Sequence, residues 1–305
     1  MSAPTQTGPT TNSKPAAPNA AVVDAAIREI SHIATLPEIT VKIIELVEDP
    51  SSTAQDLHNV ISNDPALCSR ILKVVNSSFY GLPGQIGSIN RAIVLLGLNA
   101  VKNIAISASL AKLFRGGELC PNFAARDLWQ HSIITATAAK LVADELSMGI
   151  PDEAFLSGLI HDIGVMVEMQ YNREKLVTVI GQLGVGSDGA PTKRMLEVES
   201  EVFGANHQQF GTALCGKWKF PAVFAQVCGY HHKPTDLPAG SRVLPAMVHV
   251  ADHLAGAYPK GYRLDLTTLE PDPAALEEIK LSPTKMPVLQ EKLVKSLAEA
   301  ASLLA

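Results

Sequence analysis

The 305-residue sequence is poor in cysteine, aromatic residues and charge. Its four cysteines, Cys68, Cys120, Cys215 and Cys228, form no CxxC pair, which excludes a disulfide framework and a thioredoxin-like redox motif. Aromatic residues make up 5% and charged residues 18%, whereas 47% are hydrophobic. Such a chain folds around an aliphatic core rather than remaining solvated and disordered. We expect it to reside in a reducing cytoplasm.

Basic runs and long apolar runs are also missing. The formal net charge is −5, the pI is near 6.0, and Lys and Arg are scattered, so no nucleic-acid partner is expected. No stretch reaches the roughly 18 consecutive apolar residues that a membrane helix requires, so no membrane insertion is expected. Residues 1–20 lack the apolar run of a signal peptide and indicate a disordered leader. Neither a phosphate-binding glycine loop nor a GxSxG motif occurs.

What the sequence does contain is helical periodicity. Val23, Ile27 and Ile30 recur at three- and four-residue steps, and Asp64-Pro65 is typical of a helix start, with Asp as the N-cap. Strand signals are nearly absent, which predicts an all-α, irregular multi-helix bundle. After residue 120, helices are predicted at about 123–147, 152–181, 192–217, 221–231, 241–257, 273–280 and 283–305.

Seven of the nine histidines follow residue 130. Several lie beside groups suited to metal binding: His161 precedes Asp162, and His231 adjoins His232. Each also has a simpler interpretation, as a hydrogen-bonded core residue or, for the adjacent pair, as the cationic end of a helix. Spacing alone leaves both interpretations open. Neutral imidazole and carboxylate together suit Zn, Mn or Fe.

Read in order, these residues form a recognisable series. The series is LWQHS (His131), GLIHDIG (158–164), FGANHQQFG (His207), GYHHKP (229–234) and VADHLA (250–255). It resembles the H…HD…H…HH…D ligand order of the HD superfamily of metal-dependent phosphohydrolases, in particular its HD-GYP branch. The preceding NDPAL…LKVVNSSFYG and INRAIVLLGLNAVKNIAIS segments are similar to the HDOD domain, a relative found in bacterial signalling proteins. The resemblance covers roughly residues 25–255.

The resemblance implies an all-α, HD-superfamily-like bundle with an N-terminal helical subdomain. We expect a leader (1–20), the N-terminal helical part (21–120), an HD-like part with the candidate metal site (121–260) and a C-terminal extension (261–305). It also implies one or two divalent transition-metal ions, drawn from Fe, Mn, Zn or Ni. The implied ligands of the first are His131, His161, Asp162 and Asp252, and those of the second are His207, His231 and His232. Asp162 would bridge the two ions and would be the catalytic residue of any hydrolysis.

Two departures from the HD-GYP pattern bear on function. Val165 stands where the active pattern has a lysine, and Thr235–Leu237 follow HHKP in place of a Gly-Tyr-Pro loop. The resemblance therefore favours a regulatory module that acts through signalling protein partners. The alternative is a metal-dependent phosphohydrolase acting on a nucleotide or cyclic dinucleotide, and a third hypothesis is a metal kept for structure or sensing without turnover.

Overall fold

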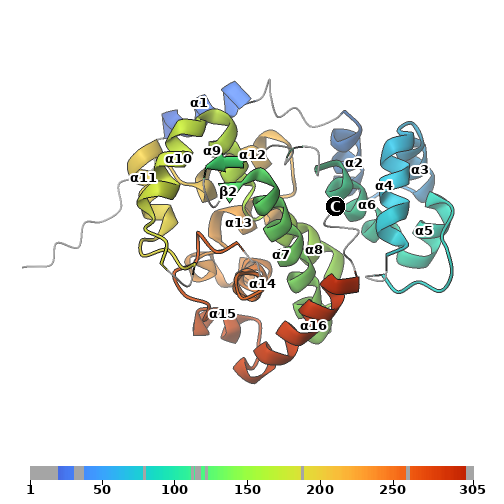
Figure 1. Ribbon diagram of the computed structural model, residues 1–305. Helices are drawn as coiled ribbons and strands as arrows, with labels where there is room; N and C mark the ends of the chain where they lie inside the picture. Colours follow the sequence, from blue (N-terminus) through green and yellow to red (C-terminus); the bar gives the residue numbers. More distant parts are fainter. Residues whose placement is uncertain are drawn as a thin grey trace, which may run out of the picture.

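The computed structural model describes residues 20–30, 38–77, 80–110, 113, 118–120, 123–186, 189–258 and 262–299 (Figure 1). The predicted all-α class is confirmed. Helices pack into an irregular bundle, and the one sheet of the described residues is a pair of short antiparallel strands, β1 (Glu118–Cys120) and β2 (Phe123–Ala124). None of the described helices is long and apolar enough to cross a membrane. The expected leader lies outside the described residues, apart from Ala20.

Six helices precede the sheet. They are α1 (Ala20–Ile30), α2 (Glu38–Glu48), α3 (Ala54–Ser62), α4 (Pro65–Val75), α5 (Ile89–Leu96) and α6 (Leu98–Leu110). Figure 1 shows α2 to α6 grouped at one end of the molecule, whereas α1 lies at the other side, where it packs against α9 and α12. The first helix is therefore part of the wall around the C-terminal helices.

Capping residues define the ends of the N-terminal helices. Thr53 and Asp56 form a capping box at the start of α3, and Asp64 accepts a hydrogen bond from the Leu67 amide at the start of α4, as the Asp-Pro signal predicts. After α4, the Asn76 side chain exchanges two hydrogen bonds with the backbone of Ile86, at 2.6 and 2.8 Å. The loop between α4 and α5 is thereby fixed as a structural turn.

The remaining helices surround α7 and α14. In order they are α7 (Ala125–Glu145), α8 (Pro151–Ile160), α9 (Ile163–Tyr171), α10 (Arg173–Gln182), α11 (Met195–Phe203), α12 (His207–Lys217), α13 (Ala222–Tyr230), α14 (Val243–Gly256), α15 (Pro273–Glu278) and α16 (Met286–Glu299). Helix α7 packs against α8, α14 and α16, and α6 packs against α8. The N-terminal helices thus touch the helix whose end carries His161.

Two long predicted helices are interrupted in the structure. The predicted 152–181 helix was wrong as a single element: it divides into α8, α9 and α10, with non-helical backbone at Asp162 and Asn172. The predicted 192–217 helix divides into α11 and α12, because Gly204 is left-handed (φ 84°) and Asn206 caps the next helix. On both sides of Asp162 the helices are buried, so apolar residues run through that break and periodicity does not reveal it. The other two breaks coincide with the capping residues Asn172 and Asn206, which apolar periodicity alone overlooks.

Glycine is required where α9 crosses α12. A Cβ added to Gly164 would lie 1.8 Å from the carbonyl oxygen of His207, far inside van der Waals contact. Since that neighbour is backbone, it cannot move aside like a flexible side chain. Gly164 therefore permits the close approach that places the start of α12 beside the break between α8 and α9.

We predict that Gly164→Ala lowers the free energy of unfolding by about 3 kcal/mol or more, because overpacking against backbone forces the two helices apart. Gly181→Ala is the matched control: Gly181 lies in α10 with nothing within 4 Å of an added Cβ, and the change should be stabilising by about 0.5–1 kcal/mol. Urea unfolding followed by circular dichroism measures both. Equal stabilities of the two variants would contradict the close packing described here.

Candidate metal centre

The structure brings together all seven of the residues that the series singled out. His131 lies in the second turn of α7, His161 and Asp162 in the break between α8 and α9, and Asp252 in α14. The second group comes from the ends of two helices: His207 is the first residue of α12, and His231 and His232 directly follow α13. The interruptions of two predicted helices thus direct His161, Asp162 and His207 toward the other residues of the cluster.

One half of the cluster is formed by two imidazoles and two carboxylates. The Nε2 atom of His131 lies 3.1 Å from Asp252 Oδ1 and 3.7 Å from Asp162 Oδ2. The Nε2 atom of His161 lies 3.3 Å from the same Asp162 oxygen and 3.8 Å from the same Asp252 oxygen. The two Nε2 atoms are 3.2 Å apart. Four donor atoms therefore converge on one small volume.

The other half uses the second oxygen of Asp162. Asp162 Oδ1 lies 3.4 Å from His231 Nε2 and 3.7 Å from His207 Nε2. His232 completes this half, with its Nε2 atom 3.1 Å from that of His207. Each oxygen of Asp162 therefore faces a different set of histidines, which is the arrangement of a carboxylate between two cations.

Outer partners orient three of the imidazoles. The Nδ1–H groups of His161 and His231 donate to the carbonyl oxygens of Gly158 and Val227, at 2.7 and 3.1 Å. His207 Nδ1 lies 2.9 Å from both oxygens of Glu199, which also accepts the His207 backbone N–H. A hydrogen bond from Nδ1 selects the tautomer that leaves Nε2 as a lone-pair donor.

Buried charges perturb the titration of the cluster. Burial alone would lower the pKa of His207, but the Glu199 carboxylate outweighs it and raises that pKa to about 9. Burial and the neighbouring imidazoles lower the pKa values of His231 and His232. Burial favours protonation of Asp162, yet its imidazole neighbours, His161 first, hold its pKa well below the usual range. Without a metal, the cluster thus favours an ionised Asp162, neutral imidazoles at His231 and His232, and a protonated His207.

The donor atoms fit a divalent transition metal. Both oxygens of Asp162, both oxygens of Asp252 and the Nε2 atom of His231 are buried without a hydrogen-bond partner. Buried polar atoms are rarely left unpaired, because their desolvation is costly. Imidazole nitrogen and carboxylate oxygen are ligands that Zn, Mn and Fe accept. A His/Asp cluster able to bind metal is therefore present.

Three acidic residues of this region belong to no recognised motif, and the sequence analysis did not predict them. Asp265 joins the cluster, with Oδ2 3.8 Å from His232 Nε2. Glu199 orients His207. Burial and the charge of the neighbouring Glu199 raise the pKa of Glu168 well above its ordinary value. A usable signal existed for Glu199, because it falls on the buried stripe of α11 between Met195 and Phe203.

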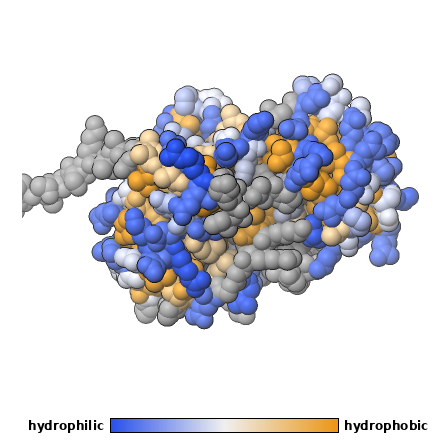
Figure 2. All heavy atoms as spheres, turned by 90° about the horizontal axis from the view of Figure 1, so that it is seen from above, coloured by the Kyte–Doolittle hydropathy of each residue, from blue (hydrophilic) through white to orange (hydrophobic). Residues whose placement is uncertain are grey.

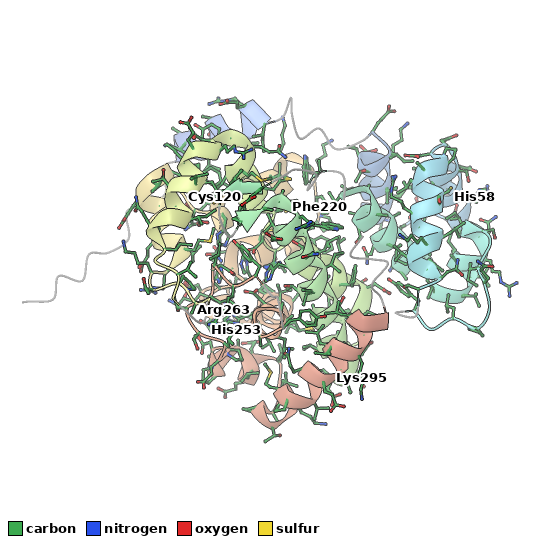
Figure 3. The ribbon with its side chains drawn as sticks, in the orientation of Figure 1. His58, Cys120, Phe220, His253, Arg263 and Lys295 are labelled. Carbon is green, nitrogen blue, oxygen red and sulfur yellow. The ribbon has the colours of Figure 1, made fainter. Side chains whose placement is uncertain are left out.

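The other described histidines do not face the cluster. His249 is held by backbone: its Nδ1–H donates to the His231 carbonyl at 2.8 Å, and its Nε2 accepts from the Asp272 amide at 3.0 Å. His253 donates to the His249 carbonyl. His58 lies on α3 among the N-terminal helices, away from this region (Figure 3). These histidines match the structural interpretation.

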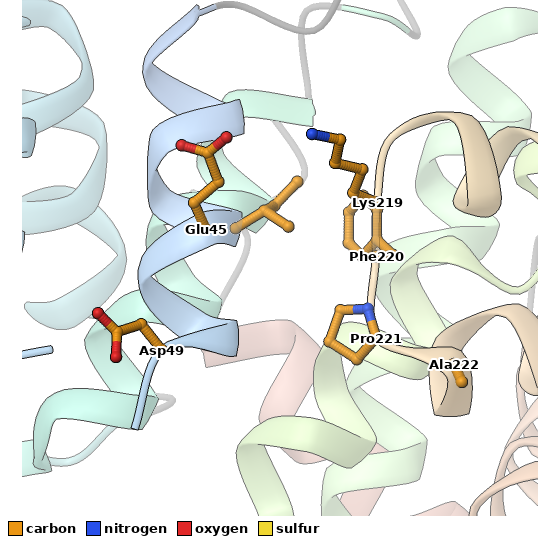
Figure 4. Close-up of a pocket in the computed structure, with 7 residues that line it drawn as sticks. Glu45, Asp49, Lys219, Phe220, Pro221 and Ala222 are labelled. Atoms are coloured by element: carbon orange, nitrogen blue, oxygen red, sulfur yellow. The ribbon is translucent and has the colours of Figure 1, made fainter. Parts of the chain in front are cut away.

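The cluster is enclosed. The side chains of its two aspartates and of four of its five histidines have no exposed surface, and that of His232 is 12% exposed. A cavity of about 530 Å³ lies elsewhere, between α2 and the turn after α12 (Figure 4). Glu45 lies opposite Lys219 across it, Asp49 also lines it, and no cluster residue does. The donor set is therefore separated from this open pocket.

Comparison with protein families gives a match to the HDOD domain over residues 33–234. The chain belongs to the HDOD family. A relative from Treponema pallidum (strain Nichols), itself uncharacterised, is 23% identical over 227 residues, which are 73% of this chain and 42% of the relative. The chain therefore spans less than half the length of that relative.

Solved structures share the fold of this HDOD protein. An HDOD domain protein of unknown function from Geobacter sulfurreducens is 21% identical, with a TM-score of 0.66, over 91% of this chain and 99% of its own. A candidate signal transduction protein from Marinobacter aquaeolei VT8 is 21% identical, with a TM-score of 0.74, over 93% and 65%. A candidate phosphohydrolase from Shewanella amazonensis SB2B is 22% identical, with a TM-score of 0.69, over 92% and 98%.

We predict a pH-dependent effect of Glu199→Gln in metal-free protein. A histidine whose folded pKa is raised stabilises the fold fully below its unfolded pKa, near 6.5, and loses that contribution as the pH rises through the folded value, here about 9. The stability difference between wild type and Glu199→Gln should therefore be largest below pH 6.5, about 3 kcal/mol at most. It should decline towards pH 9.

Urea titrations from pH 5.5 to 9.5 in a chelator measure this difference. Glu197→Gln is the control, because Glu197 lies on the same helix but is exposed and pairs with Arg194 at the surface. It should change stability little at any pH. A pH-independent effect of Glu199→Gln would show that Glu199 does not stabilise a charged His207.

Proposed function

We propose that this HDOD protein is a signal-transduction module that acts through protein partners, and that its His/Asp cluster holds one or two divalent transition-metal ions. The observation that carries the proposal is the enclosed convergence of five Nε2 atoms and two carboxylates around Asp162. Convergence supports metal binding, and enclosure supports a regulatory rather than a hydrolytic use of the metal.

Ligand assignment follows from the two halves of the cluster. His131, His161 and Asp252 would hold a first ion, His207, His231 and His232 a second, and Asp162 would contribute one oxygen to each. A divalent ion bound there supplies Lewis-acid chemistry toward phosphoryl oxygens. The chain's own residues supply the orientation, through the backbone acceptors of Nδ1, and exclude water by burial.

Hydrolysis of a nucleotide or cyclic dinucleotide is the second candidate, and the completeness of the ligand set favours it. Two features weigh against it. Val165 is fully buried in the core, so this position offers no cation to a phosphate. The proline of HHKP begins a short 3-10 helix, Pro234–Asp236, in place of the Gly-Tyr-Pro loop. Regulation is therefore the better supported function.

A partner needs an accessible surface, and the N-terminal helices supply one. On α5 the side chains of Val94 and Leu95 are 82% and 43% exposed. Figure 2 shows hydrophobic surface among hydrophilic side chains at the end of the molecule that these helices form. Helix α6 joins this end to α8, which leads directly into His161. Packed helices therefore connect the cluster to that surface.

We predict that the protein purified without a metal-chelating tag carries about one to two equivalents of a transition metal, and that Asp162→Ala loses it, because Asp162 faces both halves. Elemental mass spectrometry measures the content, and thermal unfolding measures the accompanying loss of stabilisation. Asp236→Ala, an exposed change outside the cluster, should retain the metal. An absence of metal from wild-type protein incubated with Mn²⁺ or Zn²⁺ would sink the metal proposal.

We further predict that metal-loaded wild-type protein hydrolyses neither bis(p-nitrophenyl) phosphate nor a cyclic dinucleotide faster than Asp162→Ala does. The physical reason is the enclosure of the donor atoms. Product release followed by absorbance or chromatography gives the rate. A metal-dependent rate that Asp162→Ala abolishes would favour the phosphohydrolase over the regulatory module.

A further inference from the structure

The cluster contains a third carboxylate, which comes from outside the family match. Asp265 lies in the segment Tyr262–Leu266, which follows α14 and is here named the capping segment. The HDOD match ends at residue 234, so the family pattern assigns this segment no role. The Asp265 side chain is 1% exposed, and neither of its oxygens has a hydrogen-bond partner. Burying a carboxylate without a partner is costly, and a cation bound between it and the neighbouring donor atoms would offset that cost.

Asp265 spans both halves of the cluster. One of its oxygens lies with donor atoms of His131 and Asp162 in a group whose members are all within 4.8 Å of one another. It forms a second such group with His232 and Asp252. Residues of both proposed ion positions are therefore within reach of this one side chain.

Apolar packing holds the capping segment against the cluster. Tyr262, Leu264 and Leu266 are buried, at 8%, 5% and 3% exposure, and the Tyr262 ring lies 5.3 Å from the His131 ring between centroids. Leu266 packs onto α14 at Gly256, where an added Cβ would lie 2.9 Å from its Cδ1. Asp265 lies between the buried Leu264 and Leu266 and is itself buried, so this packing holds its carboxylate against the cluster.

We propose that Asp265 is a further ligand of the metal centre, which closes it and takes the place that a phosphate group would need. This inference rests on the metal binding proposed above. A third carboxylate neutralises positive charge that would otherwise attract an anionic substrate, and it occupies space beside His232, the one partly exposed ligand. Structural metal sites are closed in this way, whereas catalytic sites keep one position open.

Two readouts on metal-loaded protein test the proposal, with Mn²⁺ and inorganic phosphate as probes. The first is Mn²⁺ affinity, measured by electron paramagnetic resonance. The Asp265→Asn variant keeps the size of the side chain but removes its charge, and it should bind Mn²⁺ about tenfold more weakly or worse, at least the loss seen for an outer-shell partner. The exposed change Asp236→Asn should leave the affinity as it is.

The second readout is phosphate access, followed as broadening of the ³¹P signal by protein-bound Mn²⁺. Wild type should cause no broadening, because the centre is closed, whereas Asp265→Asn should broaden the signal. The wild-type measurement needs no variant, so it decides the question even where Asp265→Asn fails to fold. Broadening by wild type, or unchanged Mn²⁺ affinity in a folded Asp265→Asn protein, overturns the proposal.

Mn²⁺ binding by the wild-type protein separates a wrong assignment of Asp265 from the absence of a metal centre. If Asp265 is no ligand, wild type still binds Mn²⁺ and the variant matches it. If the metal centre itself does not exist, wild type binds no Mn²⁺ at all, and the assignment of Asp265 falls with it.

Discussion

The structure depends on one buried carboxylate, that of Asp162, placed where two helices meet end to end. Its oxygens face histidines from four other elements, and its ionised form persists only because those imidazoles offset the cost of burial. A carboxylate in such a position ties α7, α8, α12 and α13 to one point. The same side chains therefore bring these helices together and form the candidate metal site.

The surroundings of Asp162 are built for rigidity. Backbone carbonyls orient His161 and His231, and Glu199 orients His207. Gly164 permits the backbone contact that brings α12 close enough for His207 to take part. Because these three imidazoles are fixed by groups other than a cation, their donor geometry exists before any ion binds, which lowers the ordering cost of binding.

Enclosure separates this centre from an ordinary hydrolytic site. The donors have almost no exposed surface, the position after HDIG is a buried valine, and Asp265 enters from the capping segment. This enclosure supports the proposal that the ligand set holds an ion and does not turn over a substrate. The exposed apolar side chains of α5 lie at the other end of the molecule, which separates the metal centre from the surface available to partners.

The helical class, many of the helices and the seven-residue series could be predicted from local signals: apolar periodicity, the Asp-Pro cap and the HD dipeptide in an apolar stretch. The break at Asp162, the approach at Gly164 and the entry of Asp265 could not be predicted in this way. Those features depend on which distant segments pack together. The helices on both sides of Asp162 are buried, which removes the periodic contrast that would mark the break between them. Asp265 lies in no motif, so only its neighbours in the fold identify it as part of the cluster.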